Sequence, residues 1–187
     1  MQFLQFKTAY RIASLIFLMT AGLWAYGPGI QKNISPYLGG FGVGPFIATS
    51  SPLKDENRGS LKITFANELL LTEQVGMFFD YNYYLPDNHH GLDIGANFFL
   101  LPGPVSPLIG FGVGGHYFNK DNQKFSDSFG PSFTAHLGLV VDVNPNLRIR
   151  FRVPYHMTLD KHYDAGVGFD ISLLFSLGAG HIKTINP

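Results

Sequence analysis

Apolar and polar residues alternate with a period of two along most of this chain, and this pattern limits the folds open to it. In residues 147–158, Ile149 and Phe151 fall on one side of an extended chain, whereas Arg150 and Arg152 fall on the other. Successive side chains of a β-strand point to opposite faces, so this alternation predicts a strand with one apolar and one polar face. The same pattern recurs in seven further segments.

Eight strands are predicted, separated by polar or turn-forming segments. Their bounds are 37–47, 58–69, 75–84, 90–100, 107–118, 131–143, 147–158 and 162–175. The connections include long polar segments, such as 48–57 and 119–130, and short ones, such as 144–146. An even number of antiparallel strands, with long loops at one end and short turns at the other, is typical of outer-membrane barrels. The expected fold is therefore all-β, a single eight-stranded antiparallel transmembrane β-barrel over 37–175.

A soluble barrel with its apolar face inside would show the same alternation, and the composition favours the inverted arrangement. Only 14% of the residues are charged, against about 25% in soluble domains. Eight strands enclose room for modest side chains only, and Gly110 and Gly112 fall on the polar face, where small residues suit a crowded interior. The apolar face is thus expected to contact lipid. The expected lipid-facing residues include Phe111, Phe151, Phe169 and Ile171.

The first 25 residues predict a cleavable secretory signal peptide. Lys7 and Arg11 precede the uncharged apolar segment 12–25, which is shorter than the roughly 20 residues of a membrane-spanning helix. A retained anchor helix is the alternative. The remaining parts are a periplasmic lead-in at 26–36, the barrel at 37–175 and a periplasmic tail at 176–187. The chain has no cysteine, so neither disulfides nor a lipoprotein anchor is expected.

Charged residues on the polar faces should be paired, because an unpaired charge inside a barrel is costly. If the segment 144–146, between the sixth and seventh predicted strands, is a three-residue turn, Asp142 lies opposite Arg148. If the loop after residue 158 also has three, Arg150 lies opposite Asp170, and both registers keep inward residues opposite inward residues. The same alternation places further charges inside, namely Arg152, Lys62, Glu68, Asp80 and Asp93. We expect these ion pairs to be structural, with ion passage as the alternative.

Histidines gather near the strand ends on the side of the long loops. His116, His156 and His162 are inward by alternation, and Ser132 lies near them. A base beside a hydroxyl can activate a nucleophile, and imidazole can also bind zinc or copper at such a rim. Polarity at the outer rim is the simpler interpretation. No catalytic, cofactor or metal site is therefore predicted, and whether the chain is an enzyme stays open.

The chain resembles the small outer-membrane barrels of the OmpA transmembrane-domain and OmpX type. The resemblance covers 37–175 and rests on the strand count, the glycine-rich strands, the charged interior and the last strand. That strand contains Gly166, Phe169 and Ile171 in the order glycine, aromatic, hydrophobic. This order is similar to the signal that such proteins present to the barrel-assembly machinery.

The resemblance implies a monomer in the outer membrane of a Gram-negative bacterium, in contact with lipid and lipopolysaccharide. The implied role is structural or in surface interaction, with a plugged polar lumen. A lipid A-modifying enzyme, of the deacylase or acyltransferase type, and a narrow ion channel are the alternatives. Lys and Arg equal Asp and Glu at 13 each, so no nucleic-acid partner is expected, and no cofactor is implied.

Overall fold

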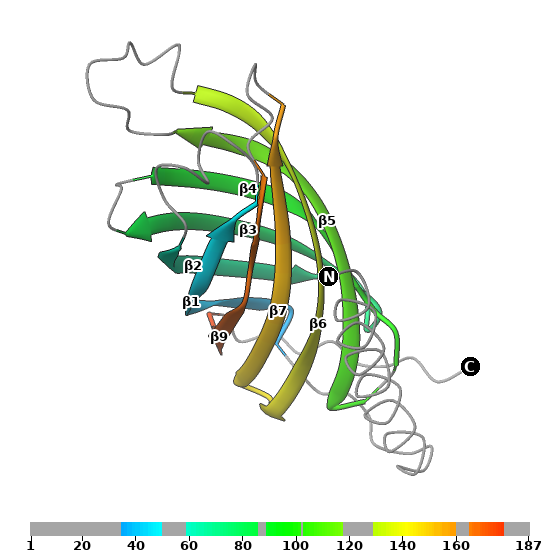
Figure 1. The fold of residues 1–187 in the computed structure, drawn as a ribbon. Coiled ribbons are helices and arrows are strands. Elements are labelled where there is room, and N and C mark those ends of the chain that lie inside the picture. The colour runs from blue at the N-terminus through cyan, green and yellow to red at the C-terminus, as the bar shows by residue number, and fades with distance from the viewer. Residues whose placement is uncertain are drawn as a thin grey trace, which may run out of the picture. The chain divides into compact units, whose positions relative to one another are not determined.

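The computed structural model describes residues 35–49, 59–85, 89–101, 103–117, 129–159 and 165–177. All strands of these residues belong to one antiparallel sheet that closes on itself (Figure 1). The predicted signal peptide, most of the lead-in, most of the tail and His162 lie outside the described residues. Among the described residues, no helix is long and apolar enough to cross a membrane.

The sheet contains the eight predicted strands, the last of which is divided in two. The bounds are β1 (Tyr37–Ala48), β2 (Ser60–Leu70), β3 (Val75–Leu85), β4 (His89–Phe99), β5 (Val105–Tyr117), β6 (Phe129–Asn144), β7 (Leu147–Thr158), β8 (Ala165–Gly168) and β9 (Asp170–Ser176). The division falls at Phe169, whose backbone N–H donates to the Pro45 carbonyl at 2.9 Å. Both β8 and β9 pair with β1 on one side and β7 on the other, which closes the barrel. The prediction of an eight-stranded barrel is confirmed.

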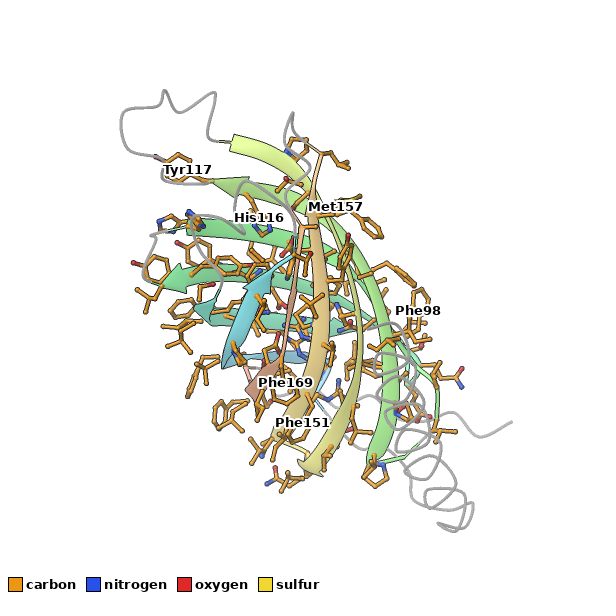
Figure 2. The ribbon with its side chains drawn as sticks, in the orientation of Figure 1. Phe98, His116, Tyr117, Phe151, Met157 and Phe169 are labelled. Carbon is orange, nitrogen blue, oxygen red and sulfur yellow. The ribbon has the colours of Figure 1, made fainter. Side chains whose placement is uncertain are left out.

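The outer surface of the barrel is apolar, as the composition predicted. Val113 is 61% exposed, Phe41 55%, Phe111 49% and Ile171 40%. Figure 2 shows the side chain of Phe98, on the same face, pointing away from the barrel. An apolar band of this kind is stable against lipid hydrocarbon, whereas a soluble barrel would bury these side chains. The inverted arrangement is therefore confirmed.

Aromatic residues cluster on the outer surface of β3, β4 and β5 near the loop end. The Tyr81 hydroxyl lies 2.5 Å from Nδ1 of His90. The His90 ring also lies beside Tyr83, at 5.0 Å, and Tyr117, at 6.2 Å, between ring centroids. Amphipathic aromatic rings are typical of the interface between hydrocarbon and headgroups. This cluster thus places one membrane interface at the loop end.

The interior is closed at the opposite end, the turn end, by an apolar layer that the sequence analysis did not foresee. This layer consists of Leu38, Ala66, Leu70, Phe99, Leu108, Val140 and Leu174. Every one of these residues is at most 4% exposed. Arg148 lies level with this layer, opposite Leu174, whereas Arg150 and Arg152 follow it along β7 toward the loop end.

Glycines make room for the larger rings of the interior. The Phe78 ring lies over Gly95 and Gly112, where a Cβ atom on either glycine would come within 2.7 Å of a ring carbon. The His116 ring lies similarly over Gly91, where a Cβ would meet a ring carbon at 2.6 Å. Such approaches are far inside van der Waals contact, so even alanine would displace these rings. The glycines of the polar face thus let a narrow barrel hold aromatic side chains.

The strand registers agree with one predicted pairing and contradict the other. Asp142 lies opposite Arg148, with a register shift between Asp142 and Asn144 that marks an irregular turn. Arg150, however, lies opposite Ser172 rather than Asp170. The predicted three-residue loop after β7 is therefore wrong, because the register corresponds to a connection two residues longer. A shift of two residues keeps every side chain on its face, so the inward and outward sets are unchanged.

Candidate functional site in the barrel interior

Three arginines on β7 form the centre of the polar interior. Arg148, Arg150 and Arg152 alternate along the strand, so the pleat points all three side chains into the lumen. Their exposed fractions are 0%, 0% and 3%. Because desolvating three guanidinium groups is costly, each must find a carboxylate inside the barrel.

Arg148 binds two carboxylates on different strands. Its Nε and one terminal nitrogen donate to Asp142 at 2.6 and 3.1 Å, across the β6–β7 pair. Its other terminal nitrogen donates to Glu68 of β2 at 2.7 Å. The guanidinium carbon also lies 4.9 Å from the centroid of the Phe99 ring. Arg148 therefore joins the apolar layer to the polar interior.

Arg150 and Arg152 meet at Asp80 of β3, on the opposite side of the lumen. Arg150 donates to the two Asp80 oxygens at 3.4 and 3.3 Å, and Arg152 donates to one of them at 2.5 Å. Arg152 also donates to the two oxygens of Asp170 at 3.2 and 3.3 Å. The predicted pairing of Arg150 with Asp170 is thus wrong, because the register places Arg152 beside Asp170 instead.

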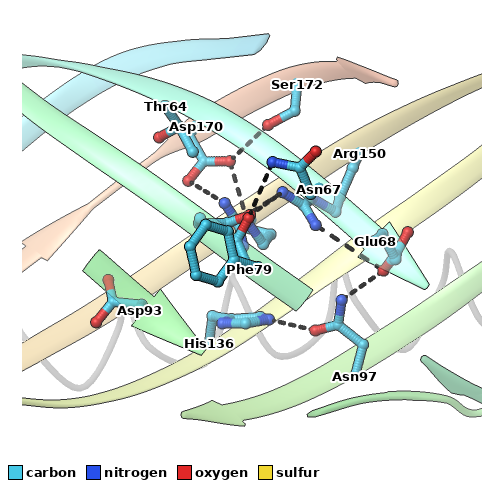
Figure 3. Close-up of polar contacts among 12 residues, drawn as sticks. Thr64, Asn67, Glu68, Phe79, Asp93, Asn97, His136, Arg150, Asp170 and Ser172 are labelled. Carbon is cyan, nitrogen blue, oxygen red and sulfur yellow. Dashed lines mark hydrogen bonds and ion pairs between the residues drawn. The ribbon is translucent and has the colours of Figure 1, made fainter. Parts of the chain in front are cut away.

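Asp170 also accepts a hydrogen bond from Lys62, the only lysine in the described interior. Lys62 donates to Asp170 at 2.7 Å, and the two side chains are 1% and 0% exposed. The Ser172 hydroxyl donates to the same carboxylate at 3.3 Å (Figure 3). Asp170 therefore connects β2, β7 and β9 through hydrogen bonds.

Neutral side chains extend this network across the lumen. His136 of β6 shares a 2.7 Å hydrogen bond with the Asn97 side-chain oxygen, and Asn97 donates to Glu68 at 2.5 Å (Figure 3). On the neighbouring strands, Thr64 donates to Asn82 at 2.9 Å. Satisfied polar networks of this kind hold a core in one arrangement.

The charges of this network balance. Lys62 and the three arginines of β7 supply four positive charges, each in contact with at least one carboxylate. Glu68, Asp80, Asp142 and Asp170 supply four negative charges. This network of four cations and four anions is thus neutral as a whole.

A second cluster, which we call the aspartate–histidine cluster, lies closer to the loop end and consists of Asp93, His116 and His156. Nε2 of His116 lies 3.6 Å from one Asp93 oxygen, and Nδ1 of His156 lies 3.6 Å from the other. The exposed fractions of the three residues are 1%, 3% and 6%. His116 and His156 were predicted to point inward near the outer rim, and both are buried; Figure 2 labels His116.

Two polar side chains donate hydrogen bonds to the Asp93 carboxylate. The Asn82 amide donates to one oxygen at 2.8 Å, and the Ser132 hydroxyl donates to the other at 3.4 Å. Ser132 was predicted near the histidines, and it hydrogen-bonds to the aspartate rather than to an imidazole. Alternation predicts that Asp93 and both histidines point inward. The approach of His156 on β7 to Asp93 on β4 could not be predicted, because these strands are not paired with each other.

The lumen is filled rather than open in the part of the chain that the structure describes. One cavity, with about 10 Å³ of room, lies among residues that include Lys62, Asp80, Asp93 and His156. This volume is about that needed for one water molecule. The arrangement therefore favours a packed polar core over a conducting pore.

Comparisons with known proteins support the fold. No family model matches the chain, and no curated protein matches its sequence. Among solved structures, the N-terminal β-barrel domain of Pseudomonas aeruginosa OprF matches with a TM-score of 0.56 and 13% identity, over 77% of this chain and 100% of that chain. Neisserial surface protein A matches with a TM-score of 0.57 and 13% identity, over 76% and 98%. The chain thus has the fold of small outer-membrane β-barrels.

Proposed function

We propose that this protein is an integral barrel of the bacterial outer membrane that serves as a closed, rigid support for its loops, with a structural or surface-interaction role. The observation that carries the proposal is the combination of an apolar outer surface with an interior filled by a neutral ionic network. A barrel filled in this way has no path for solutes, and loops carry function in such scaffolds. The matched surface protein of Neisseria is consistent with a role at the cell surface.

The lipid A enzyme alternative receives no specific support from the described residues. A lipid-modifying site must be open to the bilayer, whereas the aspartate–histidine cluster points into the lumen and is nearly fully buried. The only histidine contacts described on the outer surface are those of His90 with tyrosines. The narrow-channel alternative is disfavoured by the cations and carboxylates that fill the lumen.

Fractionation and conductance test the proposal together. We expect the mature chain in the outer-membrane fraction, resistant to urea extraction and with the heat-modifiable gel mobility of a folded barrel. In planar bilayers, the purified protein should give no steady single-channel current, and the mass of lipid A should not change on incubation with lipopolysaccharide. Recovery as a soluble monomer without detergent would refute membrane insertion, and steady large currents would refute the closed lumen.

The last strand provides the proposed contact with the barrel-assembly machinery through Gly166, Phe169 and Ile171. Phe169 and Ile171 are 41% and 40% exposed on the lipid side, where a partner could reach them. We expect Phe169→Ala to lower the folded fraction in cells but not the folded fraction after refolding in detergent. Phe111→Ala, on the same surface but outside this strand, is the control and should leave both fractions unchanged.

A further inference from the structure

Asp93 differs from the other interior carboxylates of the described residues, because no lysine or arginine lies within ion-pair distance of it. Its contacts are the Asn82 amide, the Ser132 hydroxyl and the two imidazoles of the aspartate–histidine cluster. The four other interior carboxylates already balance the four cations. A buried carboxylate without a positive partner is strongly disfavoured. A cation bound beside Asp93 would balance this carboxylate while both imidazoles stay neutral.

The geometry of the aspartate–histidine cluster suits a metal ion as that charge. Asp93, His116 and His156 each offer one ligand atom, and these three atoms lie within 4.8 Å of one another. Ligands at about 2.0–2.2 Å from a tetrahedral Zn²⁺ are roughly 3.3–3.6 Å apart. The two separations of 3.6 Å, one to each Asp93 oxygen, are close to this spacing. Binding of one ion would draw the three ligand atoms closer together than the 4.8 Å within which they now lie.

His156 gives an independent reason to place a ligand here. Neither of its ring nitrogens has a hydrogen-bond partner among the described residues, although the side chain is only 6% exposed. Its 3.6 Å separation from Asp93 is longer than a hydrogen bond. A buried polar group in this state is rare and requires an explanation. Coordination of a cation between His156 and Asp93 satisfies both groups.

We propose that Asp93, His116 and His156 bind a divalent transition-metal ion of the Zn²⁺ class inside the loop end of the barrel. Two imidazoles and one carboxylate form a ligand set that zinc accepts, with water completing the fourth position. Asn82 and Ser132 each donate a hydrogen bond to one Asp93 oxygen, as hydrogen-bonding groups do around metal-bound carboxylates. The ion would join β4, β5 and β7 across the lumen.

Zinc binding by the refolded chain tests this site. The barrel is refolded in detergent micelles, stripped with a chelator, loaded with ZnCl₂ and freed of excess ion, and its zinc content is measured. We expect one zinc per chain in the wild type. His156→Gln and Asp93→Asn should weaken binding by at least about 100-fold, since they remove direct ligands.

His136→Gln is the matched control, because His136 is an equally buried interior histidine whose nitrogen is engaged by Asn97. It should bind zinc as the wild type does. His90→Gln tests the outer surface in the same way and should also have no effect. Absence of zinc from the wild type, or equal binding by His156→Gln, would overturn the proposal. Loss of zinc in His90→Gln would place the ion on the outer surface and would also overturn it.

X-ray absorption at the zinc edge of the wild type gives a result that does not depend on whether the variants fold. We expect a first shell at about 2.0–2.2 Å, with the multiple scattering of two imidazoles. A shell without imidazole scattering would contradict the assignment. Folding of each variant is checked by heat-modifiable gel mobility before its zinc content is compared.

Discussion

The substitution Asp170→Asn tests how much charge balance inside the barrel contributes to the free energy of unfolding. Lys62 and Arg152 both donate to this carboxylate, at 2.7 and 3.2 Å, and all three side chains are at most 3% exposed. Arg152 keeps a second carboxylate, because it also donates to Asp80 at 2.5 Å. Lys62 has no other carboxylate within ion-pair distance among the described residues. The substitution therefore leaves one buried ammonium group without a counter-charge.

The expected loss in the free energy of unfolding is about 3–5 kcal/mol, the usual effect of removing one partner of a buried pair. Adding Lys62→Met to Asp170→Asn removes the unpaired ammonium group. The double variant should therefore be at least about 1 kcal/mol more stable than Asp170→Asn alone.

Urea titration in lipid vesicles measures these differences. The single tryptophan, Trp24, lies in the predicted signal peptide, so the folded fraction is better followed by gel mobility and circular dichroism. Wild-type stability of Asp170→Asn would refute a need for charge balance at this carboxylate. A loss in the double variant equal to the sum of the losses in Asp170→Asn and Lys62→Met would refute it as well, since the ammonium and the carboxylate would then be independent.

Three further outcomes can be checked by the same titration. Ile171→Arg should cost about 2–4 kcal/mol if the residue lies near the bilayer midplane, and an unchanged midpoint would contradict its lipid-facing position. Gly114→Ala should cost about 1–3 kcal/mol, because the new Cβ would meet the Leu92 carbonyl oxygen. Gly59→Ala, where the nearest atom is 4.0 Å away, should be nearly neutral. Arg148→Lys should cost about 1.5–3 kcal/mol, because one ammonium group cannot reproduce the three hydrogen bonds to two carboxylates; wild-type stability would contradict this.

The faces of the strands could be predicted from the sequence because the alternation is strict and local. Lys62, Glu68, Asp80 and Asp93 were all placed inside by it, and all are buried. The register of the last strand could not be predicted, since it depends on the length of the loop before it. The wrong loop length placed Asp170 opposite Arg150, where the structure has Ser172. Both residues nevertheless lie on the face that was predicted for them.

Contacts across the lumen were beyond the sequence analysis for a different reason. Both Arg150 and Arg152 contact Asp80, although three strands, β4, β5 and β6, lie between β3 and β7 along the chain. Such contacts depend on strand tilt and on the stagger of the closed sheet, which no single strand reveals. The same holds for Asp93 and His156. Their convergence could have been suspected only from a shortage of cations for one of the inward carboxylates.

The distribution of carboxylates around the three arginines of β7 has a consequence for how the barrel enters a membrane. The neighbouring strand β6 neutralises only Arg148, through Asp142. Arg150 and Arg152 find their carboxylates on β3 and on β9. A β6–β7 hairpin inserted alone would therefore present two bare guanidinium groups to hydrocarbon, at about 2–4 kcal/mol each near the midplane. Stepwise insertion of hairpins is thus penalised, and the strands are expected to cross the bilayer as one cooperative unit that closes as it enters.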